Sequence, residues 1–484
     1  MKTKPMKHQE KGVQLLEANP ITYALGCEQG TGKTWMLLAD AESQFKRGFI
    51  NGVLVIAPKG VHVNWVTREI PIHMSTPVRT AIWSSGAGKK QRAKIDKINK
   101  PDAAGVLDIF TINIDAINTP KGRACAWNFL RNHKAMMIVD ESQRIKSPHA
   151  KRTGHVRAMG VDAVSRRISS GTLIPNSPAD LFSQFSFLEP GLIGTTSYRS
   201  FVAEYCELLP AHHALVREII AKSKGRGGVP QIVARDKEGN PKYKNLEKLS
   251  KIIAPYTYRV LKSDCLDLPE KIYKIQPFEL SPAQRRMYGS LKKDLRWERG
   301  DGEVDIFTAL TIINKLQQVT SGFILVDGLP ADLENGKARM DALRELLEDA
   351  DGQVIIWARF REELKQIAAL ARKYGDTVEY HGGTKGKDRE KAIDDFQNGR
   401  ARFFVANPAA AGTGLTLTAA ENVIYYSCSF NLEERLQSED RSHRIGTKGN
   451  VIYTDIVGVD TIDEKIATAL QRKEAVAAQI MEWV

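Results

Sequence analysis

The chain has 484 residues, of which 42% are apolar, and it carries 70 Lys and Arg against 57 Asp and Glu. This length predicts roughly three domains or two large ones, and the apolar fraction suits ordinary globular cores. No apolar run comes near the roughly 18 residues of a spanning helix. The charged N-terminus lacks the apolar stretch of a signal peptide. Secretion, membrane spanning, collagen and wholesale disorder are therefore not expected.

The formal excess of 13 positive charges favours contact with a polyanion, nucleic acid above all. The five cysteines are scattered and form no Cys-x-x-Cys pair, so neither a zinc site nor a disulfide framework is indicated. Dispersed thiols are typical of a reducing compartment. We expect an intracellular protein, in the cytoplasm of a prokaryotic cell or of a phage-infected host.

Short apolar runs at both ends of the chain predict buried strands. In the first part these are residues 53–57 and 135–139. The last part repeats the pattern at residues 354–358, 403–406, 423–426 and 451–453. Continuous apolar runs of this length, separated by helical patterns, indicate parallel sheets covered by helices. The predicted class is α/β, with two such units bracketing the chain.

The middle of the chain has a different character. Residues 222–251 contain nine Lys or Arg and three acidic residues among several Gly and Pro. This composition predicts a flexible basic connector or an insertion loop. A solvated linker and a dedicated binding element both remain open. Residues 281–299 and 306–320 have helical patterns and predict a helical insertion at the start of the second unit.

The strongest short motif is a turn of Gly30, Thr31 and Gly32 that runs into Lys33 and Thr34. Glycines let backbone N–H groups converge on phosphate oxygens, and the N-terminus of the following helix adds a partial positive charge. In a phosphate-binding loop, Lys33 would reach the β and γ phosphates and the Thr34 hydroxyl would ligate Mg²⁺. The alternative is a chance Gly-rich turn.

Two acidic residues follow the apolar run 135–139. Asp140 and Glu141 would stand at the carboxyl end of a buried parallel strand, where nucleotide sites gather in open α/β sheets. Asp140 would hold Mg²⁺ through water, and Glu141 would orient and deprotonate the attacking water. Paired acids after a strand are otherwise often a surface turn, but the phosphate loop upstream favours the nucleotide site.

A third segment, residues 437–446, lies near the C-terminus. Arg441 and Arg444 are three residues apart, so we expect them to be neighbours on one helical face. Two guanidinium groups there suit the charge that develops on a γ-phosphate during transfer. Taken alone, the segment would be a helix with solvated salt bridges to Glu439 and Asp440.

The order of these segments resembles the Swi/Snf-type ATPases of helicase superfamily two, the group of chromatin remodellers and annealing helicases. The segments that carry the resemblance are residues 8–13, 27–34, 55–58 with Trp65, 140–146, 170–176, 337–347, 381–383, 412–417, 430–432 and 437–446. They cover nearly the whole chain. Cys27 stands where the phosphate loop usually has Gly, and Gln143 stands where the family often has His. Neither departure removes a group that hydrolysis needs.

The resemblance implies two RecA-like lobes in tandem, with ATP between them and with helical insertions. The lobes would be residues 1–210, which bind ATP, and residues 276–484, with a helical insertion near 281–330. Residues 211–275 would form a helical and basic connecting region. The resemblance further implies that hydrolysis needs the two lobes to close on each other.

The resemblance also implies roles for particular residues. The catalytic residues would be Lys33, Glu141, Arg441 and Arg444. ATP and Mg²⁺ would be bound by Gln9, Gly30, Thr31, Gly32, Lys33, Thr34, Asp140, Gly412, Gly414 and Gln437. Coupling of the ATP site to nucleic acid would rest on Gln143, Ser170, Gly171, Thr172 and Thr413.

The function that we expect is an ATP-dependent translocase on double-stranded DNA, monomeric, without a membrane partner and reduced to the motor alone. Its contacts would be to phosphates and independent of base sequence. The basic residues in 89–100 would touch phosphate or form a solvated helix face. A strand-separating DNA or RNA helicase, or a motor subunit of a restriction-like system, is the alternative. An alternative of another class is a nucleic-acid-binding protein with a nucleotide switch and no motor.

Overall fold

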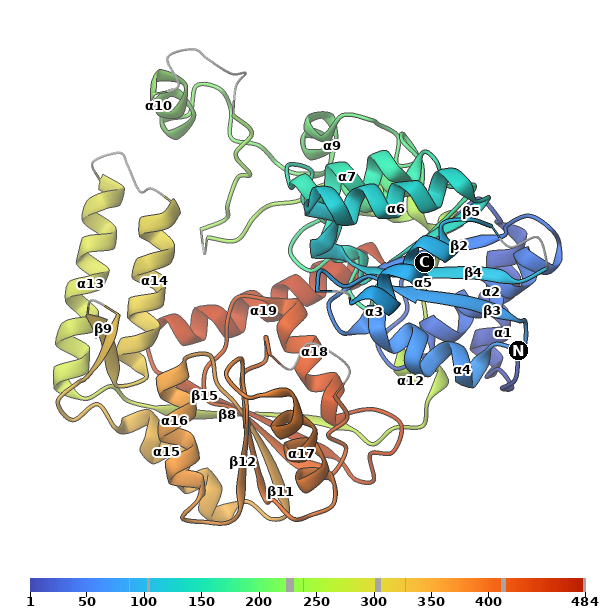
Figure 1. Cartoon of the computed structure of the whole chain (residues 1–484). Helices are drawn as coiled ribbons and strands as arrows, with labels where there is room; N and C mark the ends of the chain where they lie inside the picture. Colours follow the sequence, from blue (N-terminus) through green and yellow to red (C-terminus); the bar gives the residue numbers. More distant parts are fainter. Residues whose placement is uncertain are drawn as a thin grey trace. The chain divides into compact units, whose positions relative to one another are not determined.

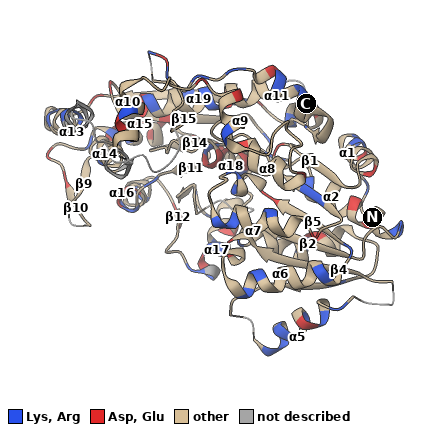
Figure 2. Ribbon diagram, turned by 90° about the horizontal axis from the view of Figure 1, so that it is seen from above, with Lys and Arg blue, Asp and Glu red and all other residues tan. Residues whose placement is uncertain are grey.

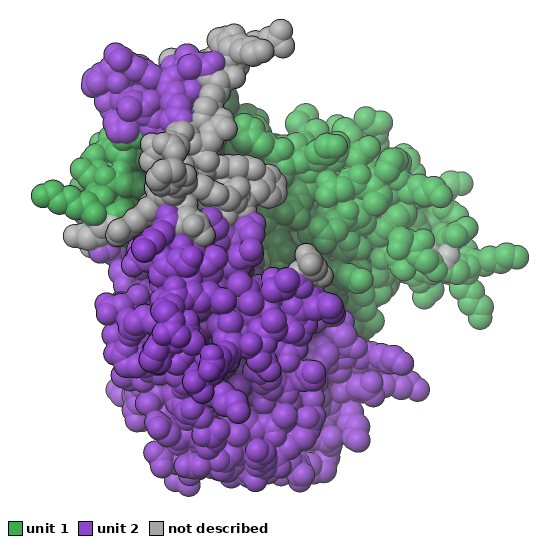
Figure 3. All heavy atoms as spheres, turned by 90° about the vertical axis from the view of Figure 1, so that its left-hand side faces the viewer, with its two compact units in different colours: residues 1–209, 231–267, 473–484 green, residues 210–230, 268–472 purple. Residues whose placement is uncertain are grey.

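The computed structural model describes residues 1–86, 88–101, 105–222, 230–237, 239–300, 306–326, 328–410 and 415–481. It divides into two compact units (Figure 3). Unit 1 comprises Met1–Leu209, Gln231–Asp267 and Lys473–Val484, and unit 2 comprises Pro210–Pro230 and Leu268–Arg472. Within the described ranges, no helix combines the length and apolar content that crossing a membrane requires.

Unit 1 is built on a seven-stranded sheet (Figure 1), in the order β3-β4-β2-β5-β6-β1-β7, and neighbouring strands are parallel throughout. Its strands are β1 (Thr22–Leu25), β2 (Gly52–Ala57), β3 (Val78–Ile82), β4 (Leu107–Asn113), β5 (Ala135–Asp140), β6 (Ser165–Ser169) and β7 (Thr257–Tyr258). Strands β2 and β5 are buried along their whole length, which confirms the strands predicted there.

Helices connect the strands of unit 1 and cover the two faces of its sheet. They are α1 (Lys7–Ala18), α2 (Lys33–Lys46), α3 (Val61–Asn64), α4 (Ile70–His73), α5 (Lys89–Ile98), α6 (Pro120–Asn132), α7 (Lys151–Gly160), α8 (Asp180–Leu188), α9 (Tyr198–Tyr205), α11 (Leu246–Ile253) and α12 (Lys262–Cys265). The π-helix η1 (Trp65–Glu69) joins α3 to α4. Short 3₁₀ turns are η2 (Ile114–Asn118), η3 (Ser142–Ile145) and η4 (Ala254–Tyr256).

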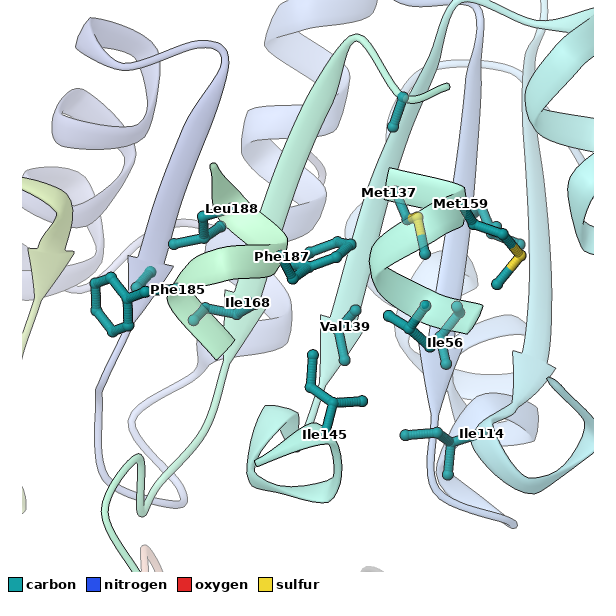
Figure 4. Close-up of a cluster of buried hydrophobic side chains, with 14 of the residues drawn as sticks. Ile56, Ile114, Met137, Val139, Ile145, Met159, Ile168, Phe185, Phe187 and Leu188 are labelled. Carbon is teal, nitrogen blue, oxygen red and sulfur yellow. The ribbon is translucent and has the colours of Figure 1, made fainter. Parts of the chain in front are cut away.

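Apolar clusters lie on both faces of the unit 1 sheet, as a doubly covered parallel sheet requires. On one face, Phe187 and Leu188 of α8 lie against Val139 and Ile168 of the central strands (Figure 4). On the other face, side chains of α2 such as Leu37 pack against neighbouring strands. The sheet is therefore a fixed platform for the loops that follow its strands.

Unit 2 has a six-stranded parallel sheet in the order β12-β13-β11-β14-β15-β8. Its strands are β8 (Lys271–Phe278), β11 (Gln353–Trp357), β12 (Thr377–Tyr380), β13 (Phe403–Ala406), β14 (Ala420–Tyr425) and β15 (Val451–Gly458). An antiparallel pair, β9 (Phe323–Val326) and β10 (Leu329–Asp332), stands apart from this sheet. Two parallel α/β sheets confirm the predicted fold class.

The helices of unit 2 are α10 (Ala214–Lys222), α13 (Pro282–Gly300), α14 (Ile306–Thr320), α15 (Ala338–Asp349), α16 (Arg361–Ala371), α17 (Gly386–Gln397), α18 (Leu432–Ser442) and the start of α19 (Ile462–Ile480). Helices α13 and α14 pack side by side where two helices were predicted. The last turns of α19 cluster with unit 1, whose core includes Ile480 and Met481.

The described part of residues 222–251 is more ordered than a bare connector. Leu208 bridges to Val233 and Cys206 bridges to Tyr243, both antiparallel, and α11 begins at Leu246. Through these bridges the described residues fold back on the segment that directly follows α9, as in the insertion loop that was one of the two predictions from composition. Residues 223–229 lie outside the described residues.

Candidate nucleotide site

Three of the predicted motifs follow neighbouring strands of the unit 1 sheet. Strand β6 lies between β5 and β1, and Ser169 at its end pairs in register with Asp140 on one side and Leu25 on the other. Because carboxyl ends of parallel strands meet at one edge of a sheet, the phosphate loop, Asp140–Glu141 and residues 170–172 gather there. The Ser170 backbone N–H donates to Leu25 O over 3.0 Å.

The phosphate loop leads directly into α2, whose first residue is Lys33. Gly30 and Gly32 have φ of 85° and 83°, the left-handed region that favours glycine. The Lys33 ammonium donates to the carbonyl oxygens of Cys27 at 2.8 Å and Glu28 at 3.1 Å. Loop and lysine therefore form one closed turn at a helix N-terminus, the geometry that binds phosphate.

Gln9 lies against this loop. Its Nε2 donates to Thr31 O at 3.3 Å, and its Oε1 accepts from the Met6 backbone N–H at 2.9 Å. A Cβ on Gly32 would stand 2.0 Å from Gln9 Nε2, so only glycine leaves room for this contact. His8 Nε2 also lies 2.8 Å from Thr31 O. The start of α1 is thus anchored to the phosphate loop, and the binding of ATP by Gln9 stays a prediction.

Burial explains how Cys27 can stand where the motif usually has Gly. Its side chain is fully buried in the apolar cluster, and its Sγ donates to Tyr258 O over 3.3 Å. Burial raises the pKa of the thiol to about 12, although the Lys33 cation pulls in the opposite direction. The residue is a small apolar filler facing away from the loop, so the departure leaves the backbone of the loop unaffected.

Asp140 is the last residue of β5 and is 7% exposed. Its Oδ1 accepts from Ser169 Oγ at 2.7 Å and from the Glu141 backbone N–H at 3.1 Å. Its Oδ2 accepts from Trp65 Nε1 at 3.0 Å. Ser169 and the hydrogen bond of Trp65 were not foreseen, because the sequence gives no sign of which side chains share one carboxylate.

Glu141 has a left-handed backbone, with φ of 53°. A non-glycine residue in this region carries local strain and is a feature of functional sites. Gln143 Nε2 donates to Glu141 Oε2 at 2.7 Å, and Ser170 Oγ donates to Gln143 Oε1 at 2.6 Å. The Thr172 backbone N–H donates to Ser170 Oγ at 2.9 Å. We call Glu141, Gln143, Ser170 and Thr172 the relay.

Two further predicted residues border this relay. Gly171 approaches the phosphate loop so closely that a Cβ would stand 2.9 Å from Gln29 Cγ. Thr34 lies in the first turn of α2, directly after Lys33. Apart from Gln9 on α1, the residues predicted in unit 1 thus lie after three adjacent strand ends and at the start of the helix that follows one of them.

In unit 2, the predicted arginines lie at the end of α18. This helix ends at Ser442, so Arg441 belongs to it and Arg444 lies beyond it. The expectation that the two share one helical face is therefore wrong. Arg444 instead donates from Nη1 to Leu415 O at 3.3 Å and to Thr416 Oγ1 at 3.1 Å, and the Leu417 N–H donates to Arg441 O at 2.8 Å.

Other predicted residues of unit 2 are less informative. Gln437 is 8% exposed and donates from Nε2 to Glu433 Oε1 at 3.2 Å within α18. Gly412, Thr413 and Gly414 lie outside the described residues. The segment 415–417 that follows them is the one that Arg441 and Arg444 contact.

Charged residues that the motifs did not indicate, all of them at least partly buried, hold α18 in place. Arg435 makes a bidentate pair with Asp455, at 2.5 and 3.0 Å, and donates to Glu439 Oε1 at 2.7 Å. Lys271 Nζ reaches Glu439 Oε2 at 2.9 Å. Burial acts against the charged form of Glu439, but the cations of Lys271 and Arg435 hold its pKa below the ordinary value. The guanidinium of Arg435 also lies over the Tyr425 ring.

The oxygen groups of unit 1 suit Mg²⁺. No cluster of three or more His, Cys, Asp or Glu that could hold a metal occurs among the residues placed by the structure. Mg²⁺ is typically bound through one or two protein oxygens, water and substrate phosphates rather than by a protein cage. The Asp140 carboxylate and the Thr34 hydroxyl beside a phosphate loop are such a donor set.

Two family models match this chain. The model described as SNF2-related domain matches residues 8–322, and the Helicase conserved C-terminal domain matches residues 338–446. The chain belongs to the SNF2 family. This confirms the resemblance, and the two matched domains are those of a helicase-like ATPase.

Individual proteins are similar to this chain over nearly its whole length. The chain is 24% identical to Chromodomain-helicase-DNA-binding protein 1-like of Danio rerio, over 98% of this chain and 43% of the relative. It is 26% identical to the Zorya protein ZorD of Escherichia coli, over 98% of this chain and 44% of the relative. It therefore spans less than half the length of either. The Sulfolobus solfataricus SWI2/SNF2 ATPase core in complex with dsDNA is 25% identical, with a TM-score of 0.41, over 99% of this chain and 93% of that one.

Proposed function

We propose that this SNF2-family chain hydrolyses ATP and uses the energy to translocate along double-stranded DNA. The observation that carries the proposal is the row of three motifs that follow β1, β6 and β5, with the relay joining those after β6 and β5. A site for phosphate, a carboxylate pair and a hydrogen-bonded path away from them stand at one edge of one sheet. A nucleotide-binding protein needs only the first of these, whereas a motor needs all three.

The residues of unit 1 suit the chemistry of hydrolysis. Lys33 and the backbone N–H groups of the loop bind the β and γ phosphates of ATP. Glu141 accepts a proton from a water whose oxygen attacks the γ-phosphorus, and ADP leaves. Bound Mg²⁺ neutralises phosphate charge, and Asp140 with Thr34 would hold it. The strained backbone of Glu141 keeps its carboxylate at a fixed place relative to Asp140.

Arg441 and Arg444 of unit 2 would supply the remaining positive charge. Guanidinium groups stabilise the charge on the γ-phosphoryl group in the transition state, and such residues are worth about 10³ to 10⁵ in turnover. We propose that two lobes, 1–210 and 276–484, act on ATP together and that residues 211–275 join them. Hydrolysis then requires both, which ties each turnover to a domain motion. The Gln437, Gly412 and Gly414 contacts to nucleotide belong to the same proposal.

Double-stranded DNA is the partner that we propose. The net charge of +13 provides affinity for phosphate that is independent of base sequence. Lys and Arg residues are spread over the helices of both units, with a group on α5 (Figure 2). The relay would report bound DNA to Glu141, with Thr413 as a further member on unit 2. The five free cysteines suit a reducing, intracellular location, and we propose that the chain acts as a monomer.

The test compares ATPase rates without nucleic acid and with single-stranded DNA, duplex DNA, forked DNA and RNA. Stimulation by duplex without unwinding of the fork supports translocation, and the Lys33→Ala variant should then have no activity. Unwinding of the fork would replace the proposal by a strand-separating helicase. A rate that no nucleic acid changes would replace it by a nucleotide switch, and full activity of Lys33→Ala would remove the site itself.

A further inference from the structure

Trp65 stands out because it joins two parts of unit 1 that the motifs treat separately. It is 2% exposed, and its indole N–H donates to Asp140 Oδ2 at 3.0 Å, across 75 positions of sequence. It is the first residue of the π-helix η1, which interrupts the helical stretch from Val61 to His73. Such π-helical turns cost hydrogen-bond regularity and are frequent at functional sites.

The hydrogen bonds on Asp140 restrict how its carboxylate can act. A carboxylate offers roughly four acceptor positions, two on each oxygen. Oδ1 accepts from Ser169 Oγ and from the Glu141 N–H, and Oδ2 accepts from Trp65. Among the described residues, the protein therefore uses both positions of Oδ1 and one of Oδ2. The remaining acceptor position is on the oxygen that Trp65 holds.

An indole is well suited to this task. It has one N–H donor and no acceptor, so the Trp65 contact fixes Oδ2 as an acceptor and cannot reverse. A rigid, buried ring also fixes the direction of the contact more sharply than a flexible side chain would. Partners in the second layer that orient a metal ligand typically change metal affinity 10-fold to 100-fold when they are removed.

We propose that Trp65 is a positioning residue for Mg²⁺: through its N–H it holds Oδ2 of Asp140 in the direction that receives a water of the Mg²⁺–nucleotide complex. This inference rests on the proposed function, because it assigns a role toward the metal that the nucleotide site would use. It assigns no contact between Trp65 and nucleotide. Its effect is exerted through Asp140 alone.

The experiment measures nucleotide binding rather than turnover. A fluorescent, non-hydrolysable ATP analogue is titrated into the full chain at a series of Mg²⁺ concentrations, with and without a chelator. Trp65→Phe keeps an aromatic ring and removes the N–H. We expect the half-saturating Mg²⁺ concentration to rise about 10-fold, with nucleotide binding in chelator unchanged.

Trp357 provides a matched control. It lies on β11 of unit 2, is fully buried, and its Nε1 has no hydrogen-bond partner among the residues that the structure describes. Trp357→Phe makes the same chemical change without removing a hydrogen bond, so the Mg²⁺ dependence of nucleotide binding should equal that of the parent. A second variant replaces Trp65 by benzothienylalanine, which keeps the shape of tryptophan with sulfur in place of N–H. It should reproduce the shift even where Trp65→Phe folds poorly.

The outcomes separate this inference from the function on which it rests. A parent chain that binds the analogue only with Mg²⁺, together with Trp65 variants whose Mg²⁺ dependence is unchanged, overturns the role of Trp65 and leaves the nucleotide site standing. Variants that lose only thermal stability overturn it as well, since packing alone would then account for Trp65. A parent chain that binds no analogue at any Mg²⁺ concentration removes both proposals.

Discussion

The predicted site residues of unit 1 and those of unit 2 are held in place by different interactions. In unit 1, Asp140, Glu141 and Ser170 are held by one another and by backbone N–H groups, on strands that lie side by side. In unit 2, α18 is held by the ion pairs of Arg435 with the partly buried Asp455 and the buried Glu439. The residues of unit 1 depend on strand order and directed hydrogen bonds, and those of unit 2 depend on largely buried ion pairs.

This difference has consequences for substitution. A directed hydrogen bond between side chains contributes about 0.5–1.5 kcal/mol net, so changes in unit 1 should alter chemistry or coupling with little loss of fold. A buried ion pair that loses one partner leaves an uncompensated charge, at about 3–5 kcal/mol. Changes at the base of α18 should therefore unfold unit 2 before they report on catalysis.

The largest expected effect is that of Arg441→Ala. It should lower the turnover number about 10³-fold or more, because in the proposed mechanism this guanidinium stabilises the charge of the transition state, and leave ATP affinity nearly unchanged. Single-turnover hydrolysis and equilibrium nucleotide binding separate the two. Arg400→Ala is the control, since Arg400 is 54% exposed and pairs with Asp394 and Asp395 on the surface. Equal loss in both variants would contradict the assignment.

Next in size is Arg435→Met, which tests the anchoring of α18. The methionine keeps the length of the side chain but leaves Asp455 without the guanidinium and Glu439 with Lys271 as its cation, so we expect unit 2 to lose about 3 kcal/mol of unfolding free energy. Urea denaturation measures it. Arg372→Met is the matched control, because Arg372 makes an exposed pair with Glu379 and should change stability by less than about 1 kcal/mol. A similar loss of unfolding free energy in both variants would contradict the expected difference between buried and surface ion pairs.

The sequence predicted the parts of the site that repeat a local rule. Apolar runs gave β2 and β5 with their bounds nearly complete, since a parallel strand buried on both faces leaves no choice of residue type. Gly30, Lys33 and Asp140 follow from the demands of a phosphate loop and a strand end. These are short-range constraints, each contained in a few consecutive residues.

The sequence could not predict the parts that depend on distant partners. Trp65 meets Asp140 from 75 positions away, and Arg435 meets Asp455 from 20. The spacing of acidic and basic residues along the sequence does not indicate which of them form buried pairs in the folded chain. The prediction for Arg444 was wrong for a local reason. Helix α18 ends at Ser442, so helical periodicity no longer places Arg444 on the same face as Arg441. Helix ends are the least predictable feature of a periodic pattern.

A smaller effect is expected from replacing Glu42. This residue lies on α2 of unit 1, away from the strand ends, and makes ionic contacts there. Burial alone would raise its pKa, but hydrogen bonds from Lys46 and Ser75 lower it from 4.5 to about 2. A carboxylate whose pKa is lower in the folded state adds stability above its unfolded pKa and loses it as the pH falls. Glu42→Gln should therefore cost about 2 kcal/mol at pH 7, a difference that shrinks from pH 5 to pH 2. Chemical denaturation at several pH values across that range measures this difference in unfolding free energy. A difference that does not change with pH would contradict the lowered pKa of Glu42.

The smallest effect should come from the relay itself. Ser170→Ala removes the hydroxyl that donates to Gln143 and accepts from the Thr172 N–H, while Lys33, Asp140 and Glu141 keep their contacts. Basal hydrolysis should therefore stay close to that of the parent. The stimulation by duplex DNA should fall about 10-fold, a coupling free energy of ~1.4 kcal/mol.

Ser183→Ala is the matched control for this variant. Ser183 is also fully buried in unit 1, and its hydroxyl has no hydrogen-bond partner among the described residues. ATPase rates measured against duplex concentration give the comparison. If Ser170→Ala lowers basal and stimulated rates equally, the hydroxyl supports the chemistry of Glu141 rather than its coupling. The contrast between the two units would then hold for stability alone, because the hydrogen bonds of unit 1 would position groups without transmitting the presence of DNA.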